Sequence, residues 1–260
     1  MNPARTQFNL VRRAPDHSAA QEQRVELLMP ACAYYPKSDR PMFMAGYREL
    51  CRVDLTGKRV LEICCANGEL SRQLAGVFPG AEVIAMDRYP EGGSSIVQAQ
   101  ASAGLTNARY YAGDATRLVE FADASLDLIF GQATLHHLVH DGGKLRDEAA
   151  RVLKPGGRLI FIFEPLGHNP IWAMIRAYRI ARMDLVDESN VVLRVLEEMA
   201  APFSRCEVQP FNLVGYPFKS LGRFASAGFM NWIDRVDVAL MQGRPGLAKM
   251  AANFNVVFTK

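Results

Sequence analysis

The spacing of hydrophobic residues predicts two kinds of structure on either side of residue 56. Before it, apolar residues recur at helical spacing over residues 21–29 and about 40–51, with Tyr34 and Tyr35 in the loop between them. Two short helices cannot enclose a core of their own. We therefore predict that residues 1–55 form a helical cap on the domain that follows.

From residue 58 onward, short apolar runs alternate with helical patterns, and the run at 159–163 is apolar at every position. Strands buried on both faces of a parallel sheet produce such continuous runs. We predict strands at 59–64, 82–86, 108–112, 126–130, 158–163, 206–214 and 253–258. Predicted helices cover 69–78, 94–103, 115–121, 143–153, 169–183 and 189–199. This order predicts a doubly wound α/β sheet over residues 56–260, mostly parallel, with an antiparallel strand near the C-terminus.

The chain has 260 residues, of which 49% are hydrophobic and 22% charged, values typical of a globular protein. The net charge is only +3 and Lys and Arg form no basic tail, so no nucleic-acid partner is expected. No apolar run approaches the ~20 residues of a membrane span, and the N-terminus lacks the apolar region of a signal peptide. Five cysteines without a C-x-x-C spacing argue against a metal site and indicate reduced thiols in a cytoplasmic protein.

Residues 60–68 read Val-Leu-Glu-Ile-Cys-Cys-Ala-Asn-Gly, an apolar run that ends in small residues, and a helical pattern follows at once. α/β proteins build nucleotide pockets from such a strand, turn and helix, because free amides at the helix start face the ligand. A dinucleotide would require G-x-G-x-x-G, whereas this turn has Cys64, Ala66 and Gly68. The turn therefore favours a smaller cofactor without phosphates, with an ordinary strand–helix connection as the alternative.

Acids follow the next two predicted strands. Asp87 ends the second strand about 20 positions after the turn, where a carboxylate accepts hydrogen bonds from ribose hydroxyls. A surface ion pair between Asp87 and Arg88 is the alternative. Asp114 follows the third strand, where a carboxylate suits an exocyclic adenine amine or the N-terminus of a helix. The fourth strand ends at Gly131, and the small residues after it permit close approach of a ligand.

Taken in this order, the motifs resemble the class I S-adenosylmethionine-dependent methyltransferase family, in particular its branch of small-molecule and quinone-type methyltransferases. Leu-His-His-Leu after the fourth strand and Leu-Lys-Pro-Gly-Gly before the fifth carry the likeness, which covers about residues 58–165. The resemblance implies a Rossmann-like sheet of seven strands with S-adenosylmethionine bound across their carboxyl ends. By position it implies that the cofactor contacts Glu62, Cys64, Ala66, Gly68, Asp87, Arg88, Asp114, Ala115, Gly131 and Gln132.

Cys64 and Ala66 depart from the family pattern, which has glycines at these two positions. Cysteine is small enough to be tolerated at the first. The methyl group of Ala66 lies where the backbone normally meets the cofactor. We therefore expect this methyl group to alter the orientation of the sulfonium more than binding itself.

His136 and His137 are the candidate catalytic bases, because imidazole titrates near neutrality. One of two neighbouring residues usually turns inward to make a structural hydrogen bond, so the alternative is that His137 orders the helix or the N-terminal cap. Glu164 and His168 follow the fifth strand, where we predict that they contact a polar substrate or cap the loop.

Two segments are predicted to border the substrate. In the cap, Tyr34 and Tyr35 suit a cation–π contact with the sulfonium or a phenolic hydrogen bond, with simple packing as the alternative. After the fifth strand, an insert at about residues 166–200 contains an apolar helix with Trp172, Met174 and Tyr178. This helix is predicted to be either a lid over the substrate or part of the core.

Three functions remain open from the sequence. The first is in-line methyl transfer to a small metabolite, which releases S-adenosylhomocysteine. The second keeps the cofactor but transfers or cyclises its aminocarboxypropyl arm, which releases methylthioadenosine. The third is cofactor binding without catalysis. A nucleic-acid methyltransferase is disfavoured because Gly131-Gln132-Ala133-Thr134 stands where an Asn-Pro-Pro-aromatic motif would be, and the turn disfavours a nicotinamide enzyme.

Overall fold

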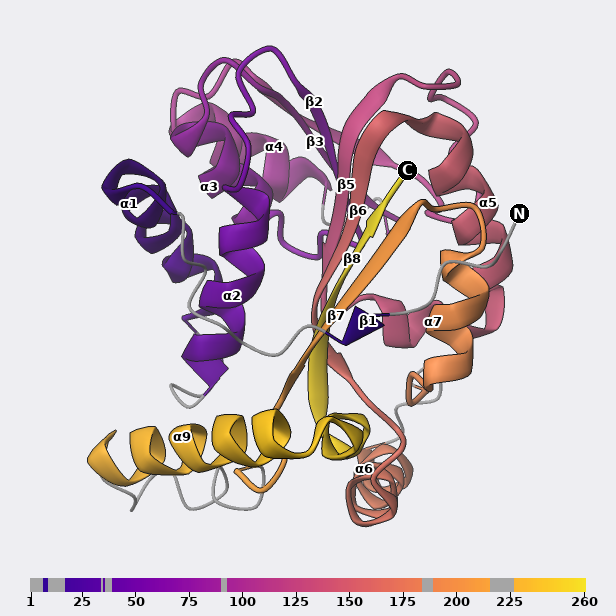
Figure 1. The fold of residues 1–260 in the computed structure, drawn as a ribbon. Coiled ribbons are helices and arrows are strands. Elements are labelled where there is room, and N and C mark those ends of the chain that lie inside the picture. Colours follow the sequence, from indigo (N-terminus) through magenta and orange to yellow (C-terminus); the bar gives the residue numbers. More distant parts are fainter. Residues whose placement is uncertain are drawn as a thin grey trace.

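A mostly parallel β-sheet runs through the centre of the molecule (Figure 1). The computed structural model describes residues 7–8, 17–33, 35, 39–89, 93–183, 189–215 and 227–260. Strand order is β1-β7-β8-β6-β5-β2-β3-β4, and β8 is antiparallel to both of its neighbours. The main strands are β2 (Arg59–Ile63), β3 (Glu82–Asp87), β4 (Ala108–Ala112), β5 (Leu126–Gln132), β6 (Leu153–Pro165), β7 (Arg205–Phe211) and β8 (Asn253–Thr259). These seven strands confirm the predicted doubly wound sheet, and the two-residue β1 (Gln7–Phe8) extends it beside β7.

Helices cover both faces of the sheet. On one face lie α1 (Ala19–Leu28), α2 (Arg40–Leu50), α3 (Glu69–Val77) and α4 (Gly93–Ser102), and on the other lie α5 (Gly142–Val152) and α7 (Leu193–Ala200) (Figure 1). Short 3-10 helices in the described part of the chain are η1 (Met29–Cys32), η4 (Leu135–His137), η5 (Val139–Asp141) and η6 (Pro245–Met250). None of the helices in the described ranges is both long and apolar enough to cross a membrane.

Hydrophobic cores on both faces of the sheet account for the continuous apolar runs of the strands. Leu128 and Ile160 pack toward α1, α2 and α3, whereas their neighbours Ile129 and Phe161 pack toward α5 and α7. All four side chains are at most 2% exposed. Successive residues of a strand point to opposite faces, so a strand between two helical layers requires apolar residues at every position.

The prediction of a helix over residues 115–121 is wrong, because the chain forms turns there. The carboxylate of Asp114 accepts hydrogen bonds from the backbone N and the hydroxyl of Thr116, both at 2.8 Å. The backbone N of Leu118 donates to Glu148 of α5 at 2.8 Å. Side chains thus satisfy the N–H groups that a helix would use. The predicted helix at 189–199 also begins later, at Leu193.

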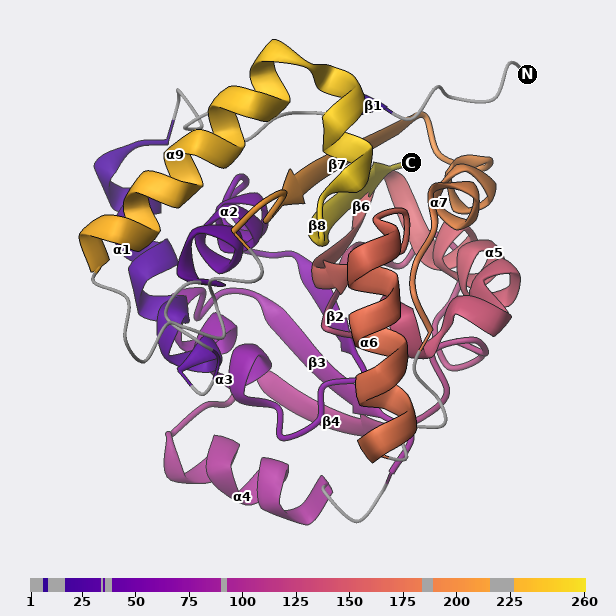
Figure 2. The same ribbon diagram turned by 90° about the horizontal axis from the view of Figure 1, so that it is seen from below.

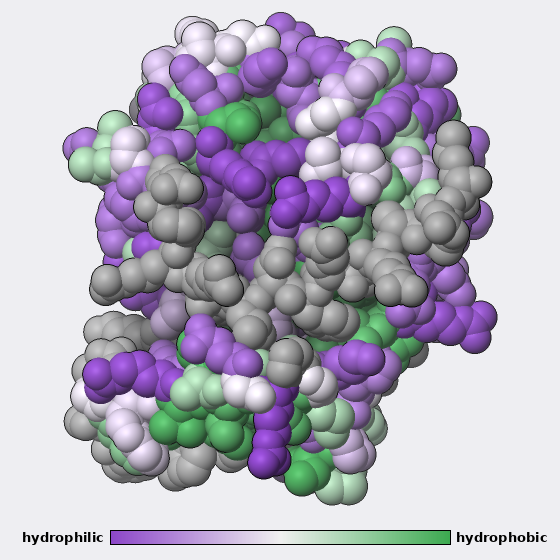
Figure 3. Space-filling model, viewed as in Figure 1, coloured by the Kyte–Doolittle hydropathy of each residue, from purple (hydrophilic) through white to green (hydrophobic). Residues whose placement is uncertain are grey.

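Two helices lie at the edge where the parallel strands end, which we call the carboxyl edge (lower edge in Figure 1, facing the viewer in Figure 2). They are α6 (Pro170–Met183) and α9 (Ala227–Gly243), the second of which was not predicted. On α6, Met174 and Tyr178 are 68% and 62% exposed, so the alternative in which these two side chains belong to the core is wrong. On α9, the ring of Phe229 stacks on exposed Trp232 at 6.0 Å. Figure 3 shows hydrophobic atoms at this lower end of the molecule, where Figure 1 places α9.

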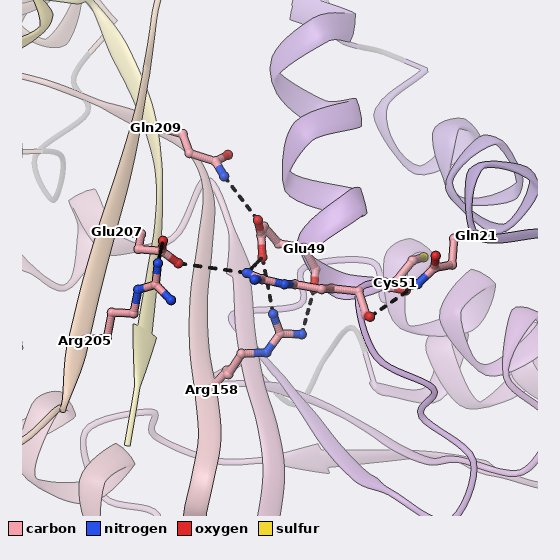
Figure 4. A network of polar contacts seen from close by, with 8 residues as sticks. Gln21, Glu49, Cys51, Arg158, Arg205, Glu207 and Gln209 are labelled. Atoms are coloured by element: carbon pink, nitrogen blue, oxygen red, sulfur yellow. Dashed lines mark hydrogen bonds and ion pairs between the residues drawn. The ribbon is translucent and has the colours of Figure 1, made fainter. Parts of the chain in front are cut away.

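A polar network joins the end of α2 to β6 and β7 (Figure 4). The Arg158 guanidinium, with 11% of its side chain exposed, donates to the backbone oxygen of Glu49 at 2.8 Å and to its carboxylate at 3.3 Å. Gln209 donates to the same carboxylate at 3.2 Å. Burial lowers the pKa of Arg158, and the negative charge of Glu49 opposes this effect. The network therefore fixes the N-terminal helices to the opposite, amino edge of the sheet.

Replacement of Glu49 by Gln removes the charge that balances buried Arg158. We predict that Glu49→Gln lowers the free energy of unfolding by ~3 kcal/mol, because an unpaired buried charge is costly. The matched control is Glu26→Gln, since the pair of Glu26 with Arg40 is 52% and 49% exposed. That control should cost no more than ~1 kcal/mol. Urea unfolding of both variants measures the difference, and equal losses would contradict the assignment.

Candidate functional site

The turn after β2 has a left-handed backbone at three positions. Cys64, Ala66 and Gly68 have φ values of 51°, 48° and 66°. Non-glycine residues in this conformation cost ~1–2 kcal/mol each. The backbone at Cys64 and Ala66 thus has the conformation that glycine favours, although both residues carry side chains. The strain is offset in part by Asp87, whose Oδ2 accepts the backbone N–H of Ala66 at 2.9 Å.

Glu62 locks β2 to α3 beneath this turn. Its carboxylate is 3% exposed and accepts hydrogen bonds from the backbone N of Ser71 at 3.0 Å and from the Ser71 hydroxyl. Burial raises the pKa of Glu62 to about 7, the Ser71 hydrogen bonds oppose the shift, and nearby Asp87 adds to it. The residue therefore fixes the angle at which the helix leaves the turn.

Asp87 and Asp114 end neighbouring strands, so they lie at the same edge. The register pairs Asp87 with Ala112, and the backbone N of Gly113 donates to the backbone oxygen of Asp87 at 2.9 Å. Arg88 contacts Asp114 at 3.2 Å, so the acid it pairs with is not the predicted Asp87. Burial raises the pKa of Asp114, but hydrogen bonds from Thr116 and the charge of Arg88 outweigh it and leave the pKa below its usual value.

The end of β5 adjoins β2 on its other side, and it brings Gly131 and Gln132 to the same edge. A Cβ at Gly131 would lie 2.9 Å from the Thr134 side chain, so the turn has no room for a larger residue. The Gln132 side-chain oxygen accepts a hydrogen bond from the hydroxyl of Tyr47 at 2.7 Å. Burial raises the pKa of this Tyr47 phenol. Sequence reasoning missed Tyr47, which occupies an ordinary apolar position of α2.

Glu164 is fully buried at the end of β6 and faces the turn after β5. Its Oε1 accepts the backbone N–H groups of Thr134 and Leu135 at 2.7 and 2.8 Å. Its Oε2 lies 3.1 Å from the backbone N of His136 and 2.8 Å from Nδ1 of the same residue. The structure thus joins Glu164 to His136, two residues that were predicted separately.

The remaining predicted residues lie around this pair. The His137 ring is 4.2 Å from the His136 ring. His168 Nε2 accepts the backbone N–H of Leu193 at 2.7 Å, so this ring caps the start of α7. Tyr35 packs against Phe43 and Phe163 with ring distances of 4.8 and 4.7 Å. Ala115, beside Asp114, is 6% exposed, and Tyr34 lies outside the described residues.

The raised pKa of Glu62 gives a prediction about stability against pH. Because its pKa is about 7 when folded and 4.5 ordinarily, the folded protein holds a proton that the unfolded chain has released in this range. Stability contributed by this group therefore falls as pH rises through that window. Glu62→Gln keeps an acceptor for Ser71 but does not titrate.

We expect the free energy of unfolding of Glu62→Gln, relative to the wild type, to rise by up to ~3 kcal/mol between about pH 5 and about pH 8. Urea unfolding at both pH values measures this. The same difference for the exposed Glu26→Gln should stay flat. A flat difference for Glu62→Gln as well would contradict the burial-driven shift.

Comparisons with known proteins agree with this arrangement. A family model described as a methyltransferase domain matches residues 61–161. A ubiquinone biosynthesis O-methyltransferase of Xanthomonas oryzae pv. oryzae is 33% identical over 193 residues, which cover 70% of this chain and 77% of that protein. A phthiotriol/phenolphthiotriol dimycocerosates methyltransferase of Mycobacterium leprae is 31% identical over 115 residues, covering 44% of this chain and 41% of that one.

Among solved structures, phosphoethanolamine N-methyltransferase 2 of Haemonchus contortus, crystallised with S-adenosyl-L-methionine, has the same fold. The TM-score is 0.60 at 19% identity, over 92% of this chain and 56% of that one. The segment matched by the family model begins within β2 and ends within β6, and it includes Asp87, Asp114 and Gly131. The chain therefore belongs to the class I S-adenosylmethionine-dependent methyltransferase family.

Proposed function

We propose that this methyltransferase moves the methyl group of S-adenosylmethionine to a small-molecule acceptor at the carboxyl edge of β2, β3, β4 and β5. The observation that carries the proposal is the gathering of the predicted acids and turns at this edge. Asp87 illustrates the fit to the cofactor. Each of its two carboxylate oxygens accepts one backbone N–H, from Ala66 and Tyr89. A carboxylate has about four acceptor sites, so two remain for the two ribose hydroxyls.

The other cofactor contacts follow the same edge. In this proposal the turn from Glu62 through Cys64 and Ala66 to Gly68 borders the methionine and ribose portion. Asp114, Ala115 and Arg88 border the adenine, and the side chain of Asp114 is 35% exposed and so open to a ligand. The backbone of Gly131 and Gln132 meets the methionine portion, since the crowding at Gly131 leaves the backbone uncovered by a side chain.

The bound cofactor supplies a methyl carbon attached to a positively charged sulfur. The protein contributes alignment, exclusion of water and, where the acceptor must lose a proton, a base. We assign that proton to His136, which is 7% exposed and held by Glu164. His137, whose ring adjoins that of His136, is the second candidate.

A small acceptor with an apolar part is supported by the surroundings of the edge. α6 and α9 both lie there and expose apolar side chains, among them Met174 at 68% and Trp232 at 55%. The names of the relatives point the same way, since they refer to ubiquinone biosynthesis and to phthiotriol dimycocerosates. We propose that the described parts of residues 166–200 form the lid and those of residues 1–55 the cap, with Tyr35, Glu164 and His168 on the acceptor side.

Release of methylthioadenosine and cofactor binding without turnover were the alternative functions. The relatives described above are all named as methyltransferases, so neither alternative gains support. The left-handed Cys64 and Ala66 also keep the turn on the path that glycines would follow. A cytoplasmic location stays part of the proposal, supported by five cysteines that form no disulfide.

The nucleoside product tests the proposal directly. We expect incubation with S-adenosylmethionine labelled in its methyl group, and a panel of small phenols, amines and thiols, to give S-adenosylhomocysteine and a labelled acceptor. Chromatography of the nucleosides and of the acceptors measures both. Methylthioadenosine as the sole nucleoside product would contradict the proposal. So would tight cofactor binding with no turnover across the panel.

A further inference from the structure

We infer that Glu164 is a positioning residue that fixes His136 in the tautomer whose Nε2 accepts a proton. The acceptor that fits such a site carries a hydrogen it must lose, as a phenolic or enolic hydroxyl does. This inference rests on the proposed function and restricts its acceptor to molecules that lose a proton during methyl transfer. It also assigns the role of base to His136 and not to His137, because Glu164 contacts the His136 ring.

The hydrogen bonds of Glu164 determine which form its carboxyl group takes. Three backbone N–H groups, those of Thr134, Leu135 and His136, donate to its two oxygens at 2.7 to 3.1 Å, and His136 Nδ1 lies 2.8 Å from Oε2. An ionised carboxylate has about four acceptor sites and no hydrogen to donate. The three backbone donors therefore match the ionised form, which leaves an acceptor site on Oε2 facing the ring, so we assign a hydrogen to His136 Nδ1.

The tautomer of His136 follows from this count. A neutral imidazole carries one hydrogen, so a hydrogen on Nδ1 leaves Nε2 with a free lone pair. Throughout the described ranges, no residue forms a hydrogen bond with His136 Nε2. Nε2 is thus the atom of this pair that is available to a ligand.

A distortion of β6 places Glu164 where it can act. β6 pairs Phe161 with Val256 but Glu164 with Phe254, so three steps on β6 match two on β8. Without this bulge, residue 163 would oppose Phe254. With the bulge, Glu164 lies opposite Phe254 instead, and its side chain points to the side of the sheet on which η4 lies. Bulges commonly redirect a side chain in this way.

The bulge carries strain that other residues hold in place. Phe163 has a φ of 66°, a conformation that costs a non-glycine residue ~1–2 kcal/mol. Fully buried Asn255 accepts the backbone N–H of Phe163 at 3.0 Å and donates to the backbone oxygen of Met42 at 2.9 Å. Strain maintained in this way is typical of functional sites. The fold therefore over-determines the position of Glu164.

The proton transfer balances for a hydroxyl acceptor. The O–H bond breaks, its electron pair stays on oxygen, and the proton moves to His136 Nε2. The oxygen gains the methyl carbon, and the sulfur keeps the electron pair of the broken carbon–sulfur bond. The imidazolium formed is then balanced by the negative charge of Glu164 at 2.8 Å. A tertiary amine has no such hydrogen and gains nothing from the pair.

Nitrogen-15 NMR of the imidazole rings tests the tautomer in the cofactor-free wild-type protein, at a pH where the ring is neutral. The signal of His136 is assigned by its absence in His136→Gln. We expect Nδ1 to be protonated and Nε2 to show the shift of an unprotonated nitrogen. In Glu164→Gln, whose amide can donate as well as accept, the hydrogen should move at least partly to Nε2. A wild-type ring protonated at Nε2 would overturn the inference, whether or not the variant folds.

Kinetics test the consequence. With a phenolic acceptor, Glu164→Gln should lower kcat by ~100-fold or more, with the KM of S-adenosylmethionine changed less than about twofold. Glu207→Gln is the control, because Glu207 is an equally charged residue with 8% exposure on β7. An unchanged kcat in Glu164→Gln would overturn the positioning role.

The same assay also tests which class of acceptor the protein methylates. Phenols are compared with tertiary amines of similar size, and transfer to the phenols is expected. Transfer to tertiary amines alone would overturn the substrate class while leaving methyl transfer intact. Because the NMR experiment needs neither cofactor nor acceptor, failure of this inference is distinguishable from failure of the proposed function.

Discussion

Carboxylates that accept backbone N–H groups are the interaction on which the carboxyl edge depends. Irregular turns leave amides unpaired, and a buried amide without a partner is costly. Glu62, Asp87, Asp114 and Glu164 each accept at least one such amide, from four different strand ends. The same acids carry the charge and acceptor capacity that a ligand with hydroxyl and amine groups requires. In the proposed function, the side chains that hold the turns in place are therefore the ones that bind the cofactor.

Strain is concentrated where these acids act. Cys64, Ala66, Ala133 and Phe163 have left-handed backbones although none is a glycine, and all four lie at or near strand ends of the carboxyl edge. Each is adjacent to a turn that an acid holds closed. The hydrogen bonds and the packing of α2 against β6 and β8 supply the stabilisation that keeps these turns in place. This arrangement gives the site a fixed shape before a ligand binds.

The sequence predicted the sheet and most of the edge because both follow local rules. Apolar runs identify doubly buried strands, and acids placed just after them must meet at one edge. What it missed depends on tertiary contacts. The Glu164–His136 bond joins residues 28 apart through a bulge, and a bulge leaves no periodic signal. The segment after Asp114 is not helical because side chains accept its backbone N–H groups, and one of these acceptors, Glu148, lies 30 residues away along the chain.

Calorimetric titration with S-adenosylhomocysteine tests most directly that the acids of the carboxyl edge hold the cofactor. The account predicts that Asp87→Asn weakens binding about tenfold or more, since it removes a charged acceptor of the ribose hydroxyls. The matched variant is Asp127→Asn, because Asp127 accepts the backbone N–H of Arg59 at 3.0 Å at the opposite, amino edge. That variant should bind as the wild type does. Equal affinities of Asp87→Asn and the wild type would contradict the account.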